Sequence, residues 1–326
     1  MNKPVALSPD FGPAFFCVSL NPAIDTRLIL NGFLPGRVNR VEEVYRTPGG
    51  KAAHVAMALK GLGADPIWIG FCGGASGSEL LAGLRLLGIE TMPVPSTQSS
   101  RVNLEIVDTR GGVTEILEPG GTITPSEWSE FQQVCARASQ VPARKRVMVI
   151  SGSLPPGIPD EAYAALVSSV RSANCLAFVD SSGVALSKAL AASPDLVKIN
   201  REEAEFVTRV AIHDPTSAAR AAHKLLDLGA NAAFVSLGDR GIVGVRKHDQ
   251  RAIHGWTTPL RAKSTVGCGD ATLAGLAYAA ATELTFERSL ALAVACGAAN
   301  CLAALPGHIL REDVSRIEQG IHTELL

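Results

Sequence analysis

The chain has 326 residues, of which 47% are hydrophobic and 19% are charged. These values are typical of a globular protein with a large core and argue against intrinsic disorder. The formal net charge of -1 provides no overall attraction to nucleic acid or to an anionic membrane surface, so we expect neither as a partner. The N-terminal stretch has no apolar core of signal-peptide length, and the seven cysteines include no Cys-x-x-Cys pair, so we expect a cytoplasmic protein with reduced thiols.

Short apolar runs alternate with helical patterns along the chain. We expect strands at 15–20, 66–71, 147–151, 176–180, 195–200 and 232–238. Among the expected helices are 79–88 with Ser78 as its N-cap, 161–172 with Asp160 as its N-cap, and an alanine-rich buried helix within 289–305. This alternation predicts an α/β fold in which helices cover both faces of a mostly parallel sheet.

Two segments, at about 26–47 and 101–118, break the alternation because they contain strand patterns without helices between them. In the second segment, polar residues from Arg101 to Glu105 alternate with apolar ones, which predicts one polar strand face. We expect both segments to form a small inserted sheet, which serves either as a lid over an active site or as a dimer surface. The predicted organisation is a flexible leader, residues 1–14, and a single domain, residues 15–326.

The sequence "STVGCGDATLAG" (264–275) places a glycine-rich turn before a helix. The amides of such a turn can converge on an anion at the helix N-terminus, where Asp270 also stands. The alternative is a tight turn in which Asp270 only caps the helix.

A second glycine turn precedes a helix in "PGGKAAHVAMALKGLG" (48–63). Lys51 lies in the first turn of that helix, where the helix dipole favours an anion over a cation. A bound anion would explain this lysine, and an exposed lysine after an ordinary turn is the alternative.

Other polar groups follow predicted strands. Asp25 ends "SLNPAID", Ser153 lies in "SGSLPPG", and "SLGDRG" (236–241) forms a turn suited to a nucleotide, although all three are also ordinary turn chemistry. Asn200 and Glu203 have the spacing of a capping box, and their oxygens could equally order waters around a magnesium ion.

These motifs, in this order, resemble the ribokinase-like sugar kinases, specifically the phosphofructokinase B family. They are most similar to its branch of 1-phosphofructokinases and tagatose-6-phosphate kinases. The resemblance extends from "SLNPAID" to "LPGHILREDV", and the two glycine turns are its most specific markers. It implies a Rossmann-like α/β domain with a small β-sheet lid that often forms a homodimer contact. It also implies magnesium-dependent transfer of the γ-phosphoryl group of ATP to a sugar hydroxyl.

The resemblance also implies roles for single residues. Asp270 matches the catalytic base, and the anion hole is matched by Gly267, Cys268 and Gly269. Contacts to the sugar or its phosphate are matched by Asp25, Gly49, Gly50, Lys51, Asn103, Ser153 and Arg101, with Arg37 and Arg40 as additional phosphate ligands on the lid. Nucleotide contacts are matched by Lys198, Asn200, Ser236, Gly238, Gly241, Thr265 and Asn300. Asn200 and Glu203 match the pair that binds Mg²⁺ through water, and a K⁺-type site would lie near Ser264 and Val266.

The cationic residues favour a phosphorylated acceptor, because arginine suits phosphate geometry and a free sugar needs no such pocket. The expected substrate is therefore fructose 6-phosphate, fructose 1-phosphate or tagatose 6-phosphate. The alternatives are a kinase of a free sugar or nucleoside, and a catalytically silent sugar-phosphate sensor.

The sequence departs from the family pattern at two positions. His54 stands where the family has an asparagine that contacts the sugar, so it either replaces that contact or alters specificity. Cys268 stands where the family usually has alanine, and a thiol near a helix N-terminus is a candidate for acidity and oxidation.

Overall fold

The computed structural model describes residues 11–249, 251–258 and 260–326. Within them the main sheet has ten strands in the order β14-β13-β12-β11-β10-β9-β8-β1-β4-β5. From β11 to β5 all pairings are parallel, whereas β12, β13 and β14 pair antiparallel at one edge. The strands are β1 (Ala14–Ser19), β4 (Pro66–Cys72), β5 (Glu90–Pro95), β8 (Arg146–Ser151), β9 (Leu176–Asp180), β10 (Leu196–Asn200), β11 (Ala232–Ser236), β12 (Ile242–Arg246), β13 (Ala252–Trp256) and β14 (His322–Leu325). The six predicted strands are all present, so the expected mostly parallel sheet is confirmed.

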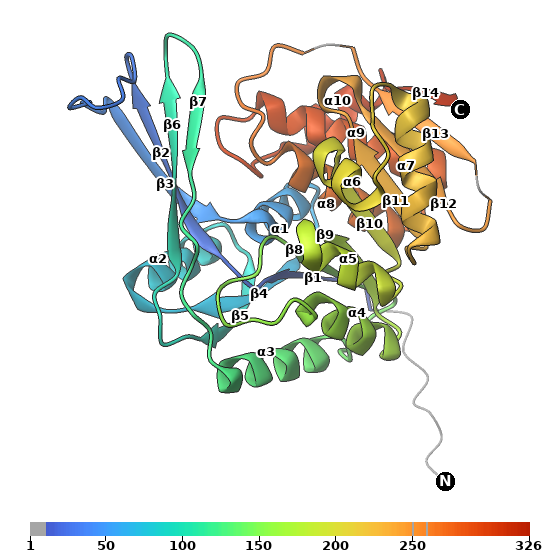
Figure 1. Ribbon diagram of the computed structural model, residues 1–326, viewed down its shortest axis with the longest axis horizontal. Helices are drawn as coiled ribbons and strands as arrows, with labels where there is room; N and C mark the ends of the chain where they lie inside the picture. The colour runs from blue at the N-terminus through green and yellow to red at the C-terminus, as the bar shows by residue number, and fades with distance from the viewer. Residues whose placement is uncertain (1–10, 250, 259) are drawn as a thin grey trace.

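Helices cover both faces of this sheet (Figure 1). One face carries α3 (Pro125–Ala138), α4 (Ala162–Ser172), α5 (Gly183–Ala191), α6 (Arg201–Thr208) and α7 (Pro215–Asp227). The other carries α1 (Lys51–Gly61), α2 (Gly74–Leu86), α8 (Cys268–Ala281), α9 (Phe286–Leu302) and α10 (Arg311–Glu318).

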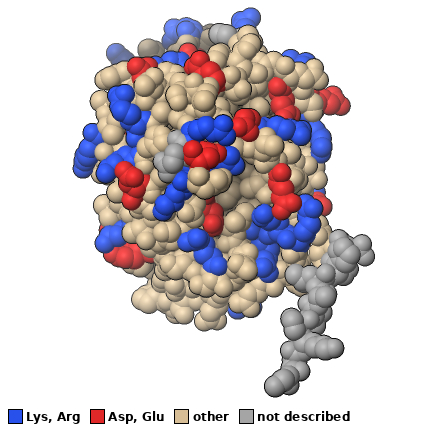
Figure 2. Space-filling model, turned by 90° about the vertical axis from the view of Figure 1, so that its right-hand side faces the viewer, with Lys and Arg blue, Asp and Glu red and all other residues tan. Residues whose placement is uncertain are grey.

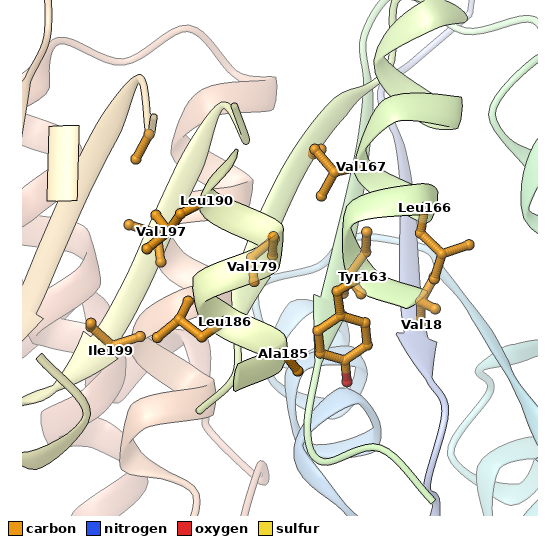
Figure 3. Packing of buried hydrophobic residues seen from close by; sticks show 14 of the residues in the cluster. Val18, Tyr163, Leu166, Val167, Val179, Ala185, Leu186, Leu190, Val197 and Ile199 are labelled. Carbon is orange, nitrogen blue, oxygen red and sulfur yellow. The ribbon is translucent and has the colours of Figure 1, made fainter. Parts of the chain in front are cut away.

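The two faces have separate hydrophobic cores because successive strand residues point to opposite sides. In β1, Phe16 and Val18 pack with α3 to α7, whereas Phe15 and Cys17 pack with α1 and α8. Figure 3 shows part of the first core, where Tyr163 and its neighbours lie against the sheet. Each core is a cluster of buried hydrophobic residues on one face of the sheet.

The two irregular segments form a separate small sheet. In the described chain it contains β2 (Ala23–Leu30), β3 (Glu43–Gly49), β6 (Arg101–Asp108) and β7 (Val113–Ile116), in the order β3-β2-β6-β7. Figure 1 shows these strands projecting from the body of the domain. Apolar side chains remain exposed on it at Val44, Tyr45, Val113, Ile116 and Leu117. The predicted second sheet is therefore present.

Two predicted N-caps are wrong. Ser78 lies inside α2, where its Oγ donates to the Gly74 carbonyl at 3.1 Å, because the helix already starts after the Gly73 turn. Asp160 makes no cap to α4, whose N-cap is Glu161 without a side-chain bond. A backbone turn from Ala162 N–H to Pro159 O, 3.0 Å, precedes that helix instead.

The sequence also predicts an N-terminal leader and a buried apolar helix. Most of the expected leader, residues 1–10, lies outside the described residues. The helix expected within 289–305 is α9, and it packs against α8. In the part of the chain that is described, no helix combines the length and apolarity needed to cross a bilayer. On the face displayed in Figure 2, acidic and basic side chains are both present rather than basic ones alone.

Candidate active site

A cavity of about 1240 Å³ opens at the carboxyl ends of the parallel strands, beside the small sheet. Ligands of open α/β sheets bind at this edge, since the strands end there and the helices begin. Most of the sequence-predicted site residues line it: Asp25, Gly50, Lys51, His54, Arg101, Asn103, Ser153, Lys198, Asn200, Glu203, Ser236, Gly238, Gly241, Thr265, Gly267, Cys268, Gly269 and Asp270. Residues far apart in the sequence therefore share one cavity.

The glycine turn lies at the start of α8. Gly267 has φ of 80°, and a Cβ there would lie 2.9 Å from Pro306, so the position requires glycine. The first amides of a helix have no intrahelical acceptor, and the helix dipole makes them favourable for an anion. A Cβ at Gly269 would lie 2.6 Å from the Lys198 ammonium, which places a positive charge against the same turn. The arrangement suits a phosphate group.

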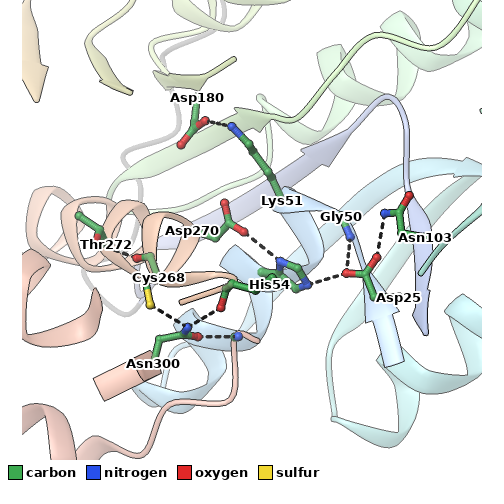
Figure 4. A network of polar contacts seen from close by, with 12 residues as sticks. Asp25, Gly50, Lys51, His54, Asn103, Asp180, Cys268, Asp270, Thr272 and Asn300 are labelled. Carbon is green, nitrogen blue, oxygen red and sulfur yellow. Dashed lines mark hydrogen bonds and ion pairs between the residues drawn. The ribbon is translucent and has the colours of Figure 1, made fainter. Parts of the chain in front are cut away.

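His54 connects two carboxylates in the cavity (Figure 4). Its Nδ1 lies 2.9 Å from Asp270 Oδ2, and its Nε2 lies 3.0 Å from Asp25 Oδ2. Asp25 Oδ1 accepts a 2.9 Å hydrogen bond from Asn103, and its Oδ2 accepts one from Gly50 N–H at 3.3 Å. Both ring nitrogens of His54 thus face acidic groups of the protein.

These contacts favour the charged imidazolium. Burial opposes the charge, but the hydrogen bonds and negative charges of Asp25 and Asp270 outweigh it and raise the pKa of His54 to about 10. Burial likewise opposes ionisation of Asp25, yet hydrogen bonds from His54, Asn103 and Gly50 keep the pKa of that carboxyl below its usual value. Burial and the charge of His54 lower the pKa of the neighbouring His308. At neutral pH the cavity therefore contains a protonated histidine between two aspartates.

This bridge predicts a pH-dependent stability. A raised folded-state pKa contributes stability that is complete below the unfolded value of 6.5 and is lost as pH rises through about 10. We expect His54→Asn to be less stable than the parent near pH 6.5, by a few kcal/mol, with the difference shrinking towards pH 10. Urea unfolding at several pH values measures it. A deficit that is constant over this range would show that His54 is neutral in the folded protein.

A second ionic cluster surrounds Asp180 at the end of β9. Its carboxylate is fully buried and is paired with Lys51 through Oδ1 and with Lys198 through Oδ2, at 2.9 Å for the latter. Burial alone would favour the neutral acid, but the two lysines lower the pKa of Asp180 to about 2. Lys51 also lies 3.4 Å from Glu203, and these carboxylates raise the pKa of Lys51, although its partial burial opposes the charge. The partners of Lys51 in the structure are therefore acidic side chains, which explain its place in the first helical turn without a bound anion.

Asn200 and Glu203 form the capping box of α6. Asn200 Oδ1 accepts from Glu203 N–H and Glu203 Oε2 accepts from Asn200 N–H, both at 2.9 Å. Both residues line the cavity, each of these oxygens has a second lone pair, and hard oxygen donors suit Mg²⁺. The described residues contain no cluster of three or more His, Cys, Asp or Glu able to hold a metal alone. The pair fits a magnesium ion held mainly by water and by a phosphate ligand.

Arg101 lines the cavity from β6 of the small sheet. Its Nε donates to Asn21 O at 3.2 Å and its Nη1 to Glu118 O at 2.9 Å. Asn21 in turn donates to Ser153 Oγ at 3.1 Å. Within the described residues no ion pair links Arg101 to a carboxylate, so two carbonyl groups orient the guanidinium while its charge stays available.

Four predicted residues are not among those lining the cavity. Arg37 and Arg40 are exposed in the connection between β2 and β3. Gly49 is buried in β3, where a Cβ would lie 2.2 Å from Asp25. Asn300 is 1% exposed and its amide bonds Val266 O at 2.8 Å and Gly307 N–H at 2.7 Å, so it holds the turn before α8 rather than facing a nucleotide.

Sequence reasoning missed several polar residues of the cavity. Asp180 is the last residue of the predicted strand 176–180, as Asn200 is of the strand 195–200, so the same signal could have identified it. Arg27 and Glu105 pair at 2.7 Å on the small sheet, and Cys301 comes from α9. No local pattern marks Cys301, because only the packing of α9 brings it to the cavity.

The comparison with known families agrees with this geometry. The "pfkB family carbohydrate kinase" description matches residues 17–311. The chain belongs to the pfkB family of carbohydrate kinases. The predicted family and fold are therefore confirmed.

Curated relatives of the pfkB family span most of the chain. The chain is 31% identical to ATP-dependent 6-phosphofructokinase isozyme 2 of Escherichia coli (strain K12), over 88% of this chain and 92% of the relative. It is 29% identical to 1-phosphofructokinase of Vibrio cholerae, over 95% and 96%, and 30% identical to tagatose-6-phosphate kinase of Staphylococcus epidermidis, over 93% and 97%. All three are carbohydrate kinases by name.

Solved structures of Escherichia coli phosphofructokinase-2 resemble the fold closely. Its tetrameric inhibited form aligns with a TM-score of 0.85 at 28% identity, its potassium complex with 0.86 at 28%, and its fructose-6-phosphate complex with 0.84 at 27%. Each alignment covers 95% of this chain and 98% of the other.

Proposed function

We propose that this chain transfers the γ-phosphoryl group of ATP to a hydroxyl group of a ketohexose phosphate. The observation that supports this substrate class is Arg101, whose guanidinium lines the sugar end of the cavity without a carboxylate partner among the described residues. Arginine binds phosphate through paired N–H donors, whereas an unphosphorylated sugar would leave this charge uncompensated. The phosphorylated acceptors named for the relatives support the same choice.

The proposed chemistry takes place at the start of α8. Asp270 acts as the general base that accepts the proton of the attacking hydroxyl, which must lie within about 3 Å of its carboxylate. The amides of the turn and the Lys198 ammonium stabilise negative charge on the transferred phosphoryl group, which is the main catalytic contribution in such reactions. Asp25 and Asn103 bond the sugar hydroxyls. Ser236, Gly238, Gly241 and Thr265 border the nucleotide.

His54 is proposed to position the two aspartates. Both its nitrogens face carboxylates, so it is not free to replace the amide that the family pattern has for the sugar. Asp25 is proposed to bind the acceptor, and Asp270 to remove its proton. The His54 bridge sets the distance between these two carboxylates. This assigns the departure at position 54 to a positioning role.

Asn200 and Glu203 are proposed to hold Mg²⁺ through water. When bound, Mg²⁺ neutralises charge on the phosphates of ATP. The potassium complex of the Escherichia coli relative supports binding of a monovalent cation, which we place near Ser264 and Val266 as a proposal. The exposed apolar side chains of the small sheet support a homodimer through it, and the free thiols of all seven cysteines, which lie in the described chain, support a cytoplasmic location.

An ADP-release assay with Mg-ATP tests the proposal. The acceptors are fructose 6-phosphate, fructose 1-phosphate, tagatose 6-phosphate, free fructose, ribose and adenosine. We expect turnover with at least one ketohexose phosphate and little with the three unphosphorylated compounds. Preferred turnover of a free sugar or of adenosine would favour the second kinase hypothesis, and binding of a ketohexose phosphate without turnover of any acceptor would favour the sensor.

Arg101→Gln tests the phosphate site within this assay. We expect a rise in KM for the sugar phosphate of about 10- to 100-fold, because a hydrogen bond to a charged group contributes about 1.5–3 kcal/mol. The matched control is Arg40→Gln, which removes an exposed arginine outside the cavity and should leave KM unchanged. Equal KM values for the Arg101 variant and its parent would contradict a phosphate-binding role.

A further inference from the structure

Two cysteines meet at the edge of the cavity. Cys268 is the first residue of α8, and Cys301 lies one residue before the end of α9. Their sulfur atoms are 3.0 Å apart. Both side chains are partly exposed, and both line the cavity, so a small oxidant in solution can reach them.

The packing of α8 on α9 produces this contact. A Cβ at Gly275 would lie 3.0 Å from Ala293, and one at Gly297 would lie 2.5 Å from the Thr272 hydroxyl. The two glycines therefore allow the helices to approach closely, which brings the two sulfur atoms together. Neither the proton transfer nor the phosphoryl transfer proposed above uses a thiol.

We propose that Cys268 and Cys301 form a reversible disulfide that distorts the anion-binding turn and switches the kinase off. An S–S bond is about 2.0 Å long, so the sulfur atoms need to approach by only about 1 Å. Cys268 belongs to the turn itself, next to Gly267 and Gly269, so its displacement moves the amides beside the phosphoryl group.

The two thiols have unequal acidity. The contact between the two sulfur atoms raises the pKa of the Cys268 thiol, with burial adding to the effect, and lowers the pKa of Cys301 to about 7. A thiolate with a pKa near the ambient pH is a good nucleophile. The expectation of an acidic Cys268 is therefore wrong, and Cys301 is the more acidic thiol of the pair.

The oxidation uses hydrogen peroxide as the oxidant. The Cys301 thiolate attacks one peroxide oxygen and breaks the O–O bond, which forms a sulfenic acid and hydroxide. Cys268 sulfur then attacks the sulfenic sulfur, the S–S bond forms, and the hydroxyl leaves as water with the thiol proton. Two thiols and one peroxide yield one disulfide and two waters, and dithiothreitol reverses the change.

Peroxide treatment of the full chain tests the proposal, with linked peptides measured by mass spectrometry without reduction and turnover measured in parallel. We expect a peptide linking the two cysteines and a loss of turnover on the order of 100-fold, as for a 1 Å misplacement in an active site. Dithiothreitol should restore turnover. Cys301→Ser, or Cys301→Ala as a second variant, should keep the reduced activity and resist peroxide.

The matched control is Cys72→Ser, which removes another partly exposed thiol and should respond to peroxide like the parent. Absence of the linked peptide, full activity of the linked enzyme, or equal inactivation of Cys301→Ser would each overturn the proposal. The predicted loss of turnover rests on the proposed kinase function, whereas the predicted formation of the linked peptide is independent of it. A reduced chain that phosphorylates no acceptor therefore contradicts the kinase function, while the mass measurement still decides the disulfide.

Discussion

Asp270→Asn is expected to lower kcat by a factor on the order of 10²–10⁴, the usual contribution of a general base. The substitution keeps the size of the side chain and an oxygen that can accept from His54 Nδ1, now at 2.9 Å from the carboxylate. It removes the group that would take the hydroxyl proton. The KM values for ATP and for the sugar phosphate should change little, because the binding groups stay in place.

Steady-state kinetics with the best acceptor measures this effect. The matched control is Asp25→Asn, at the other end of the His54 bridge. Since Asp25 is assigned to acceptor binding, its loss should raise KM for the sugar phosphate more than it lowers kcat. If Asp270→Asn retained the parent kcat, Asp270 could not be the general base, and another group would have to accept the hydroxyl proton.

Asp180→Asn is expected to lower the free energy of unfolding by about 3–5 kcal/mol, the usual cost of removing one partner of a buried ion pair. The carboxylate is fully buried and its partner Lys198 is 3% exposed, so the substitution leaves an ammonium group without its countercharge in the interior. The Lys51 side chain is more exposed, so the loss of its ion pair with Asp180 should cost less stability. Urea unfolding at pH 7 measures the change.

The pH dependence separates this ion pair from a packing effect. A lowered folded-state pKa contributes stability that is present above the unfolded value of 3.8 and is lost as pH falls to about 2. The difference between the parent and Asp180→Asn should therefore shrink below about pH 4. Asp227→Asn, which breaks a solvated pair with Lys224 at 3.8 Å, is the matched control and should cost no more than about 1 kcal/mol. Equal effects of the two substitutions would mean that water screens the Asp180 cluster.

The main sheet was predictable from local sequence because buried parallel strands are continuous apolar runs. The runs at 147–151 and 176–180 became β8 and β9, which both end at the predicted residue, although β8 begins one residue earlier, at Arg146. The helix starts were less predictable. Ser78 and Asp160 are good capping residues by type, but α2 begins after a glycine turn and α4 follows a backbone turn, so neither helix needs them.

The sequence by itself determined the family and the parallel sheet, and most of the site residues that it predicted line the cavity, because glycine turns and polar residues at strand ends are local patterns that the fold brings to one edge. Only the tertiary structure decided the partners of those residues. It placed Lys51 against Asp180 and Glu203, His54 between Asp25 and Asp270, and Cys301 beside Cys268. Each of these contacts joins residues that are 29 or more positions apart in the sequence, as for His54 and Asp25 (54 − 25 = 29), so no local pattern encodes it. The charge of a buried group depends on such partners. Packing therefore decides which groups of the cavity are charged.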